Sequence, residues 1–397
     1  MSHVIAEAAL RDGARIERGI ARHADEFIAL RRDLHRHPEL AFKEHRTAAL
    51  VAEKLRAWGY AVSTGLAGTG VVGVLRRGAG KKALGLRADM DALPIQEATG
   101  LPYASVNPGV MHACGHDGHT AILLAAARFL AESGEFDGTL NLIFQPAEEM
   151  GAGARQMIAE GLFERFPCDA VFGLHNWPGV RQGHLGCVAG PAMASIDFAR
   201  ITLQGQGGHG AEPQDTVDPV LAAAHVITAL QSVVSRNVAP LDMGVVTVGA
   251  IHGGKAANVI PDQVELKLTA RSFRPETRQR LRERITAIAQ GQARSLGAEA
   301  VVDFQNGFPP VLNHEEPTRF AREVALEALG AERVLPDFQP RTASEDFAYM
   351  LQARPGSFLF LGNGDSASLH NPGYDFNDAT LGVAASYWAR LAERFLR

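Results

Sequence analysis

The sequence predicts an α/β domain that is interrupted by a smaller α+β domain. Short apolar runs alternate with helical stretches over residues 1–190, and the same alternation returns over residues 309–397. Residues 191–308, between them, follow a different order of elements. A chain of 397 residues is also too long for one small core, so two domains are expected.

The first α/β part begins with residues 20–60. We expect them to be helical, because apolar residues recur at helical spacing in DEFIALRRDL and Pro38 ends the pattern. A buried helix is expected over DGHTAILLAAARFLAES (117–133), with Asp117 as its N-terminal cap. Four apolar runs are expected to be strands of a mainly parallel sheet: VVGVL (71–75), ALGLRA (83–88), TLNLIF (139–144) and AVFGL (170–174).

The interrupting part follows a Gly/Pro-rich joint at residues 186–195. Its strand-like and helical runs have the order β-α-β-β-α-β, which is the ferredoxin-like pattern: 196–203, 218–234, 244–251, 264–270, 275–297 and 300–304. In the first helix, apolar residues spaced three and four apart predict the buried face: Val220, Ala223, Ile227, Leu230 and Val234.

The α/β pattern then resumes with a helix over 316–329, a strand over 357–362 and a C-terminal helix. We therefore place one domain at 1–190 and 309–397, and an inserted domain at 191–308.

Composition and charge exclude several classes of function. The formal net charge is −5 and no Lys/Arg block stands out, so neither nucleic acid nor an anionic membrane is expected as a partner. No apolar run approaches the roughly 18 residues of a membrane span, and the N-terminus lacks the apolar core of a secretory signal. Three cysteines do not make a disulfide framework, so a cytoplasmic location is expected.

The densest cluster of chemically active side chains is HACGHDGH, which holds one cysteine and three histidines between residues 112 and 119. Thiolate and imidazole are good ligands for zinc and other first-row metals, so Cys114 and His116 are candidate metal ligands. The competing interpretation is a glycine-rich turn with incidental histidines, and the cluster alone does not separate the two.

Further candidates follow the predicted strands. Glu148 and Glu149 come after TLNLIF, where one carboxylate could bind metal and the other act as general base, although adjacent carboxylates often only face water. The same place after other strands is taken by Asp89, His175 and His370. Carboxyl ends of parallel strands lie at one edge of a sheet, so these residues are expected to meet there.

The number of candidates indicates more than one ion. A cysteine, three histidines and a glutamate exceed what one tetrahedral ion with an open position needs, and predict two ions that share a ligand. Asp89 is expected to orient a ligand histidine through its second ring nitrogen.

The inserted domain carries its own candidates. His209 lies in the flexible loop GGHGAEP, Asn258 precedes a proline break in NVIP, and Arg271 follows the strand VELKLTA. An arginine could hold a substrate carboxylate with a bidentate pair, and a histidine could donate to an oxyanion. The plainer interpretation is a turn histidine and a solvated strand arginine.

The motifs RRDLHRHPEL, RADMDALP, MHACGHDGHTA, QPAEE, GLHNWP, GGHGAEP, NVIPD and SEDFAYM occur together and in this order. The set resembles the M20 metallopeptidase superfamily, in the aminoacylase and carboxypeptidase branch that includes hippurate hydrolase and plant auxin-conjugate hydrolases. The resemblance covers nearly the whole chain and implies a zinc-exopeptidase-like catalytic domain.

The resemblance also implies roles for single residues. Cys114 would bridge two metal ions; His116 and His175 would complete one site, and Glu149 and His370 the other. Glu148 would be the general base, and Asp89 would support the site. The inserted domain would form a homodimer or a dimer of dimers, so that His209 reaches the active site of the other subunit. Asn258 and Arg271 would hold the substrate, with Arg271 on its carboxylate.

One departure from the wider superfamily concerns the metal. Many members have aspartate as the bridging ligand and histidine at the position of Arg87, whereas this chain has Cys114. A thiolate favours zinc, and manganese, cobalt or nickel stay open.

The leading hypothesis is hydrolysis of N-acyl or N-aroyl amino acids, such as hippurate, by a metal-bound hydroxide with Glu148 as general base. One alternative is a dipeptidase or aminopeptidase, for which the sequence offers no evident carboxylate to bind a substrate ammonium. The others are a non-catalytic binding protein on the same fold and a cysteine hydrolase that uses Cys114.

Overall fold

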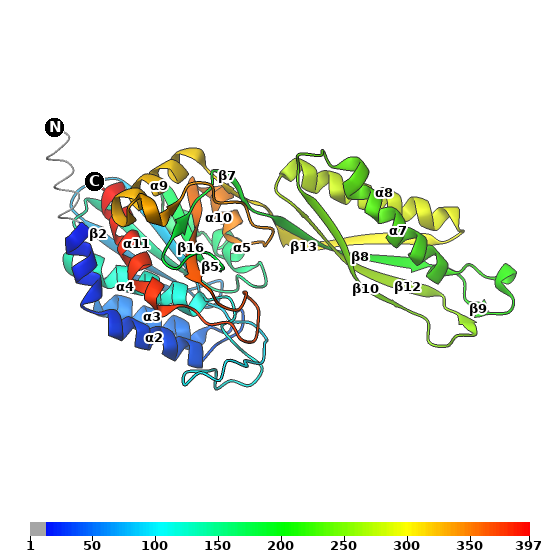
Figure 1. Ribbon diagram of the computed structural model, residues 1–397, viewed down its shortest axis with the longest axis horizontal. Coiled ribbons are helices and arrows are strands. Elements are labelled where there is room, and N and C mark those ends of the chain that lie inside the picture. The colour runs from blue at the N-terminus through cyan, green and yellow to red at the C-terminus, as the bar shows by residue number, and fades with distance from the viewer. Residues whose placement is uncertain (1–12) are drawn as a thin grey trace. The chain divides into compact units, whose positions relative to one another are not determined.

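The computed structural model describes residues 13–397, with the side chain of residue 306 left out. The chain divides into two compact units (Figure 1). The first unit runs to Gly190 and takes in Leu312–Gln339 and Asp346–Arg397; the second consists of Pro191–Val311 and Pro340–Glu345. The prediction about a secretory signal concerns an N-terminus whose first twelve residues lie outside the described part.

The first unit is built on a mixed sheet that has eight strands among the described residues, in the order β1-β2-β4-β3-β5-β16-β6-β15. The four central strands are parallel: β4 (Gly138–Gln145), β3 (Ala83–Asp89), β5 (Ala170–Pro178) and β16 (Gly356–Gly364). The outer strands are β1 (Ala61–Leu66), β2 (Gly70–Arg77), β6 (Leu185–Gly186) and β15 (Val334–Leu335). This mostly parallel centre confirms the predicted α/β class.

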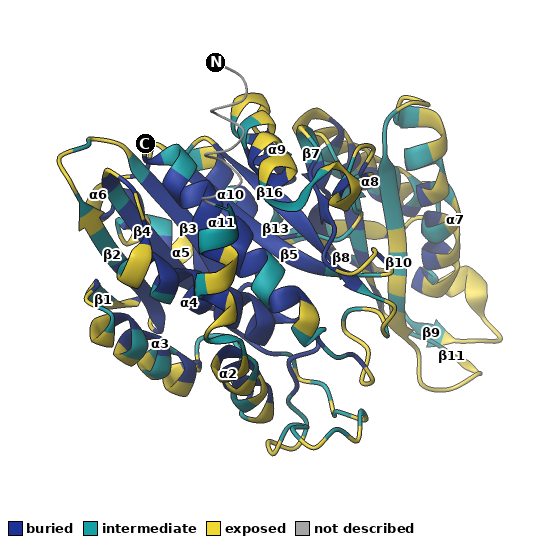
Figure 2. Cartoon of the chain, turned by 60° about the vertical axis from the view of Figure 1, so that its left-hand side comes forward, coloured by how far each residue is buried: buried dark blue, intermediate teal, exposed yellow. Residues whose placement is uncertain are grey.

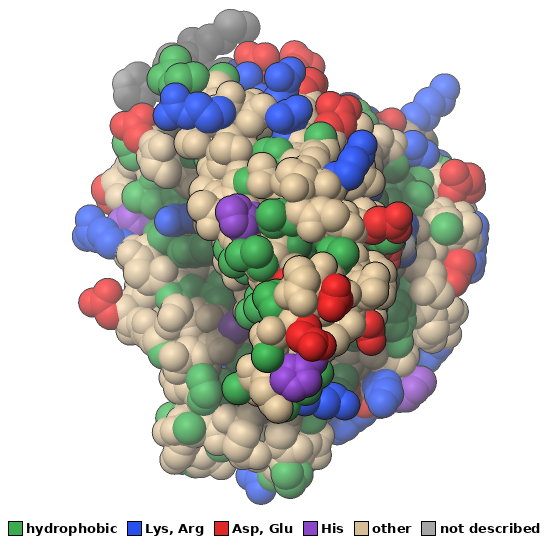
Figure 3. Space-filling model, turned by 90° about the vertical axis from the view of Figure 1, so that its right-hand side faces the viewer, with side chains coloured by type: hydrophobic (Ala, Val, Ile, Leu, Met, Phe, Trp, Pro, Cys, Tyr) green, Lys and Arg blue, Asp and Glu red, His purple; other side chains and the backbone are tan. Residues whose placement is uncertain are grey.

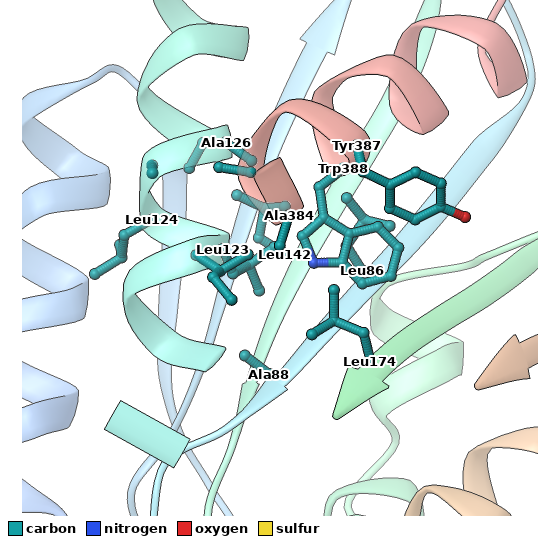
Figure 4. Packing of buried hydrophobic residues seen from close by; sticks show 14 of the residues in the cluster. Leu86, Ala88, Leu123, Leu124, Ala126, Leu142, Leu174, Ala384, Tyr387 and Trp388 are labelled. Carbon is teal, nitrogen blue, oxygen red and sulfur yellow. The ribbon is translucent and has the colours of Figure 1, made fainter. Parts of the chain in front are cut away.

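Helices cover this sheet, and the buried strands lie between them (Figure 2). They are α2 (Ala24–Arg36), α3 (His45–Ala57), α4 (His116–Ser133), α5 (Gly153–Ala159), α6 (Leu162–Arg165), α9 (Glu315–Leu329), α10 (Phe347–Ala353) and α11 (Leu381–Phe395). Helices α4 and α11 pack against each other and both contact β3, where Leu123 and Trp388 meet the strand residue Leu86 in one apolar cluster (Figure 4).

The start of α4 differs from the prediction. Its N-terminal cap is Gly115, and no side chain caps the helix there. Asp117 is not the cap, because its carboxylate lies 2.9 Å from Nδ1 of His35 and is also close to Arg31. A buried cationic partner therefore holds the side chain that was expected to cap the helix.

The second unit has the element order β8 (Ser195–Gln204), α7 (Pro219–Asn237), β10 (Gly244–Gly253), β12 (Gln263–Ser272), α8 (Pro275–Ser295) and β13 (Glu299–Phe308). These strands form an antiparallel sheet in the order β10-β12-β8-β13. Two short strands, β9 (Gly208–His209) and β11 (Val259–Ile260), pair beside it. The remaining short strands of the chain are β7 (Gly190–Met193) and β14 (Val311–Asn313).

Helices α7 and α8 cover one face of this sheet and complete a separate apolar core. The buried face of α7 is offset from the predicted one, because it is formed by Ala222, Ala223, Val226, Leu230 and Val233. Val220 is 43% exposed, although the spacing predicted it to be buried. Ala222 and Ala223 are fully buried in this core.

The segment Pro340–Glu345 is grouped with the second unit. The amide of Arg341 donates to the carbonyl of Ala192 over 2.9 Å, and the amide of Ala194 donates to that of Ala343 over 2.9 Å. Compactness does not test independent folding, so the domain limits 1–190 with 309–397, and 191–308, stay a prediction.

Two surface properties bear on possible partners. In the described part of the chain, no helix is both long enough and apolar enough to cross a membrane. One face of the molecule carries interspersed acidic and basic side chains (Figure 3). A face of mixed sign gives little long-range attraction for a highly charged ligand.

Candidate metal centre

The candidate ligands of the first unit come from the carboxyl-terminal ends of neighbouring strands. Asp89 ends β3, Glu148 and Glu149 follow β4, and His175 lies near the end of β5. These strands are parallel neighbours, so their ends share one edge of the sheet. Cys114 lies in the loop before α4. Its sulfur is close to the ligand atom of His175, so it belongs to the same edge of the sheet.

Two groups of potential metal ligands share Cys114. The ligand atoms of Cys114, His116 and His175 lie within 4.8 Å of one another, and Sγ of Cys114 is 3.3 Å from Nε2 of His175. The ligand atoms of Cys114, Glu149 and His370 form a second such group. Nε2 of His370 is 3.4 Å from Oε2 of Glu149. The geometry therefore brings together all five predicted ligands, with the thiol common to both groups.

In two histidines of this cluster, Nδ1 contacts a backbone carbonyl oxygen. Nδ1 of His116 lies 2.8 Å from the carbonyl oxygen of Asp91, and Nδ1 of His175 lies 2.6 Å from that of Asn176. A carbonyl oxygen only accepts, so each Nδ1 carries a proton and Nε2 of the neutral ring is left as the ligand atom. Burial lowers the pKa of His175 well below its usual value, which keeps that ring neutral.

Several buried carboxylates surround Cys114 and His116 and shift the pKa values of both side chains. Burial, followed by Glu149 and Glu148, raises the pKa of the Cys114 thiol well above its usual value. Burial by itself lowers the pKa of His116, but Asp89, Asp91 and Glu149 raise it to about 10. Nearby carboxylates contribute to both shifts, and a bound cation would neutralise their negative charge.

Two buried polar atoms among the candidate ligands have no hydrogen-bond partner, which bears on whether these residues fit a metal ion. Nε2 of His116 and Oε1 of Glu149 are buried without a hydrogen-bond partner, and they lie 3.9 Å apart. Buried polar atoms are normally satisfied, and a metal ion would satisfy both. Thiolate, imidazole and carboxylate are also the donor set that zinc takes. The residues present therefore fit a metal centre.

The loop that carries Cys114 has a local requirement for glycine. Gly115 has a φ of 93°, a left-handed conformation that glycine adopts without strain. A Cβ atom there would lie 2.2 Å from Nδ2 of Asn176. That amide donates to the carbonyl of Cys114 over 2.7 Å, so the close approach fixes the backbone of the shared ligand.

His370 is also held in an unusual conformation. Its φ of 63° lies in the left-handed region, which is costly for a residue with a side chain. Its amide donates to the carbonyl of Ala113 over 2.8 Å, which ties it to the loop before Cys114.

Asp89 contacts His119, a histidine that is not one of the five candidate ligands. Its Oδ1 lies 2.6 Å from Nδ1 of His119, and its Oδ2 lies 3.7 Å from Nε2 of His116. Nε2 of His119 accepts the backbone N–H of Asn176 over 3.0 Å, so the proton of this ring sits on Nδ1 and is donated to Asp89. His119 thereby links β3 to the residue after His175.

Glu148 lies beside the candidate ligands and is 5% exposed. One of its oxygens forms a group within 4.8 Å with ligand atoms of His116 and Glu149. Its Oε1 accepts the backbone N–H of Asp346 over 3.3 Å. The carboxylate of Glu148 therefore lies next to the candidate metal ligands.

A buried network beneath the cluster was not evident from the sequence. Arg87 donates to Oδ2 of Asp89 and to Oε1 of Gln145, each over 2.8 Å, and to Oδ1 of Asp346 over 3.2 Å. Asp346 lies in the SEDFAYM motif, which gave no role for it. Gln145 and Asp346 come from distant segments, so local spacing could not have indicated the whole network.

The second unit contains the other three candidates. His209 and Asn258 are exposed and lie close together, since the amide of Gly210 donates to the carbonyl of Asn258 over 2.9 Å. Arg271 is half-buried, and it donates to the carbonyl of Thr342 over 2.9 Å and to the hydroxyl of Ser344 over 3.1 Å. Burial lowers the pKa of Arg271, although a guanidinium stays charged.

Comparison with known proteins finds relatives that match most of this chain. Over 372 residues, the chain is 46% identical to hippurate hydrolase of Campylobacter jejuni, covering 94% of this chain and 97% of that enzyme. It is 41% identical to N-acetyl-L-cysteine deacetylase of Bacillus subtilis, covering 94% of this chain and 88% of the relative. A crystal structure described as a dinuclear metal-binding peptidase of the M20 family, from Bacillus subtilis, superposes with a TM-score of 0.83 at 36% identity, covering 95% and 99%.

The fold, the candidate ligand groups and these similarities define a metallo-amidohydrolase. Residues 85–394 match the model of peptidase family M20/M25/M40. The chain belongs to this family.

Proposed function

We propose that this protein hydrolyses the amide bond of N-acyl or N-aroyl amino acids, of which hippurate is the model, to a carboxylic acid and a free amino acid. The similarity to hippurate hydrolase and to N-acetyl-L-cysteine deacetylase supports this substrate class. The observation that carries the proposal is the sharing of Cys114 by two ligand groups, with the Glu148 carboxylate beside them.

The proposed cofactor is a pair of divalent ions, with zinc favoured by the thiolate and manganese, cobalt or nickel as alternatives. His116 and His175 would hold one ion, Glu149 and His370 the other, and Cys114 both. Bound ions would polarise the amide carbonyl and lower the pKa of water at the site.

The proposed role of Glu148 is proton transfer. Its carboxylate takes a proton from the water that attacks the amide carbonyl carbon. The carbon–nitrogen bond then breaks, and the same proton passes to the leaving nitrogen of the amino acid. The low exposure of Glu148, 5%, favours this role because it limits competition by bulk water.

The second unit would supply the substrate carboxylate site and the partner contact. We propose that Arg271 binds the carboxylate, with Asn258 also on the substrate, and that His209 stabilises the oxyanion from the other subunit of a cytoplasmic homodimer. Support for a partner comes from β10, an edge strand with Ile251 51% exposed, and from α7, where Leu221 is 50% exposed.

A substrate screen with defined metals tests the proposal. Release of free amino acid would be measured for benzoyl-glycine, N-acetyl amino acids and glycyl-glycine, in wild type and in Glu148→Gln. We expect turnover of acylated amino acids, little turnover of the dipeptide, and a loss of about 100- to 10,000-fold in kcat for Glu148→Gln with metal still bound. Preference for glycyl-glycine would indicate a dipeptidase, and no turnover of any amide would indicate a binding protein.

A further inference from the structure

Asp91 contacts three residues of the metal centre without being one of its candidate ligands, and its Oδ1 also lies 3.4 Å from Nδ1 of His116. Oδ1 of Asp91 accepts the backbone N–H of Glu148 over 3.0 Å, and Oδ2 accepts that of Glu149 over 3.1 Å. The carbonyl oxygen of the same residue lies 2.8 Å from Nδ1 of His116. One residue at the end of β3 thus contacts two successive residues after β4 and one at the start of α4.

The backbone that donates these hydrogen bonds includes a residue in a strained conformation. Ala147, just before Glu148, has a φ of 53° in the left-handed region, which disfavours a residue with a Cβ atom. Its amide donates to Oε1 of Glu44 over 2.9 Å. Three consecutive amides are therefore held by two buried carboxylates, those of Glu44 and Asp91.

Asp91 is itself held firmly. The amide of Ala92 donates to the carbonyl of Glu39 over 2.8 Å, and Leu93 exchanges two bonds of 3.0 Å with Met111. Asp91 is 1% exposed, so water has little access to replace its carboxylate. Because its neighbours on the chain are fixed, its oxygens act as fixed points for the residues that they contact.

We propose that Asp91 is the positioning residue that sets the separation between the general base Glu148, the metal ligand Glu149 and the ring of His116. The inference rests on the proposed function, which gives those three residues their roles. Both carboxylate oxygens are needed, since each accepts a different amide. The carbonyl contact also fixes the tautomer of His116, which leaves Nε2 to the metal.

Two substitutions separate position from charge. Asp91→Asn keeps one acceptor, but its amide nitrogen would face a backbone N–H, so one bond is lost. Asp91→Glu keeps the charge and both oxygens but moves them by one methylene. A matched control is Glu393→Gln: this glutamate is fully buried in the same unit and accepts the amide of Glu135 over 2.8 Å.

The experiment measures Mn²⁺ binding by calorimetry, thermal melting of the metal-free proteins, and kcat and KM with benzoyl-glycine. We expect both Asp91 variants to bind Mn²⁺ about 10- to 100-fold more weakly and to lose kcat by a similar factor. KM should change little, and melting should resemble that of Glu393→Gln. That control should bind Mn²⁺ and turn over substrate as wild type does.

Wild-type Mn²⁺ affinity and kcat in either folded Asp91 variant would overturn the proposal, as would equal losses in the control. If neither variant folds while the control does, Asp91 serves folding and the positioning role is rejected. The proposed function fails separately, when wild type binds Mn²⁺ but cleaves no acylated amino acid. In that case the Mn²⁺ affinities still decide the role of Asp91.

Discussion

The Sγ atom of Cys114 lies 3.3 Å from Nε2 of His175, and the same sulfur belongs to the group that Glu149 and His370 complete. A ligand shared in this way couples the two proposed ions, because its removal would open both sites at once.

Replacement of Cys114 tests this coupling. Cys114→Ala should bind neither ion tightly and should lose kcat by about a hundredfold or more, whereas Cys114→Asp should keep both ions. A carboxylate is a harder ligand than a thiolate, so the aspartate variant should shift its preference from zinc toward manganese. Metal content and turnover are measured after dialysis against each metal. An inactive but fully metal-loaded Cys114→Asp would favour the cysteine-hydrolase alternative, in which the thiol is the nucleophile.

Replacement of Arg271 tests its proposed role in binding the substrate carboxylate. Arg271→Ala should lower kcat/KM for benzoyl-glycine by about 10- to 150-fold, the value of a hydrogen bond to a charged group, mainly through KM. Benzoyl-glycinamide, which has no carboxylate, should be cleaved about equally by both proteins. The control is Arg274→Ala, since the Arg274 side chain is 64% exposed. Equal losses on the acid and the amide would contradict the role of Arg271.

The raised pKa of His35 predicts that the free energy of unfolding depends on pH. Burial by itself lowers its pKa, but Asp117 and Glu97 raise it from 6.5 to about 9. A pKa that is raised on folding stabilises fully below 6.5, and this stabilisation is lost as pH rises through about 9. The change is on the order of 3 kcal/mol in the free energy of unfolding. Urea unfolding across this range should show the decline in wild type, and a flatter profile in His35→Gln. Parallel profiles would refute the assignment.

Arg87 tests the network beneath the metal centre. It is 1% exposed and donates to Asp89, Gln145 and Asp346. Arg87→Met would leave two buried carboxylates without this partner, which should lower the free energy of unfolding by about 3–5 kcal/mol.

Arg319→Met is the comparison for this loss, because the Arg319 side chain is 65% exposed and pairs with Glu316 and Glu323 at the surface. That change should cost about 1 kcal/mol or less. Similar losses for the two variants, measured by urea unfolding of metal-free protein, would show that the buried network contributes no special stability.

The metal-ligand candidates could be predicted because one rule places them. Parallel strands put their carboxyl ends at one edge of a sheet, so Glu149 and His175 could be assigned to one site from their positions after apolar runs. Their assembly around Cys114 needs no further information than strand order and the cysteine motif.

The supporting contacts could not be predicted, because they depend on backbone groups and distant segments. Asp91 acts through amides of the β4 end, and Glu44 reaches Ala147 from 103 residues away. The expected cap, Asp117, instead pairs with His35, and the helix begins after Gly115 without a side-chain cap. Side-chain types alone carry no signal for such choices.

The most direct test of a metal-dependent amidohydrolase with a shared thiol is a titration of chelator-treated protein with Co²⁺, followed by cobalt–thiolate absorption and by turnover of benzoyl-glycine. We predict no turnover without metal, a thiolate band that grows until two ions per chain are bound, and full activity only near that point. Full turnover by protein that holds no metal, or binding without the thiolate band, would contradict the account.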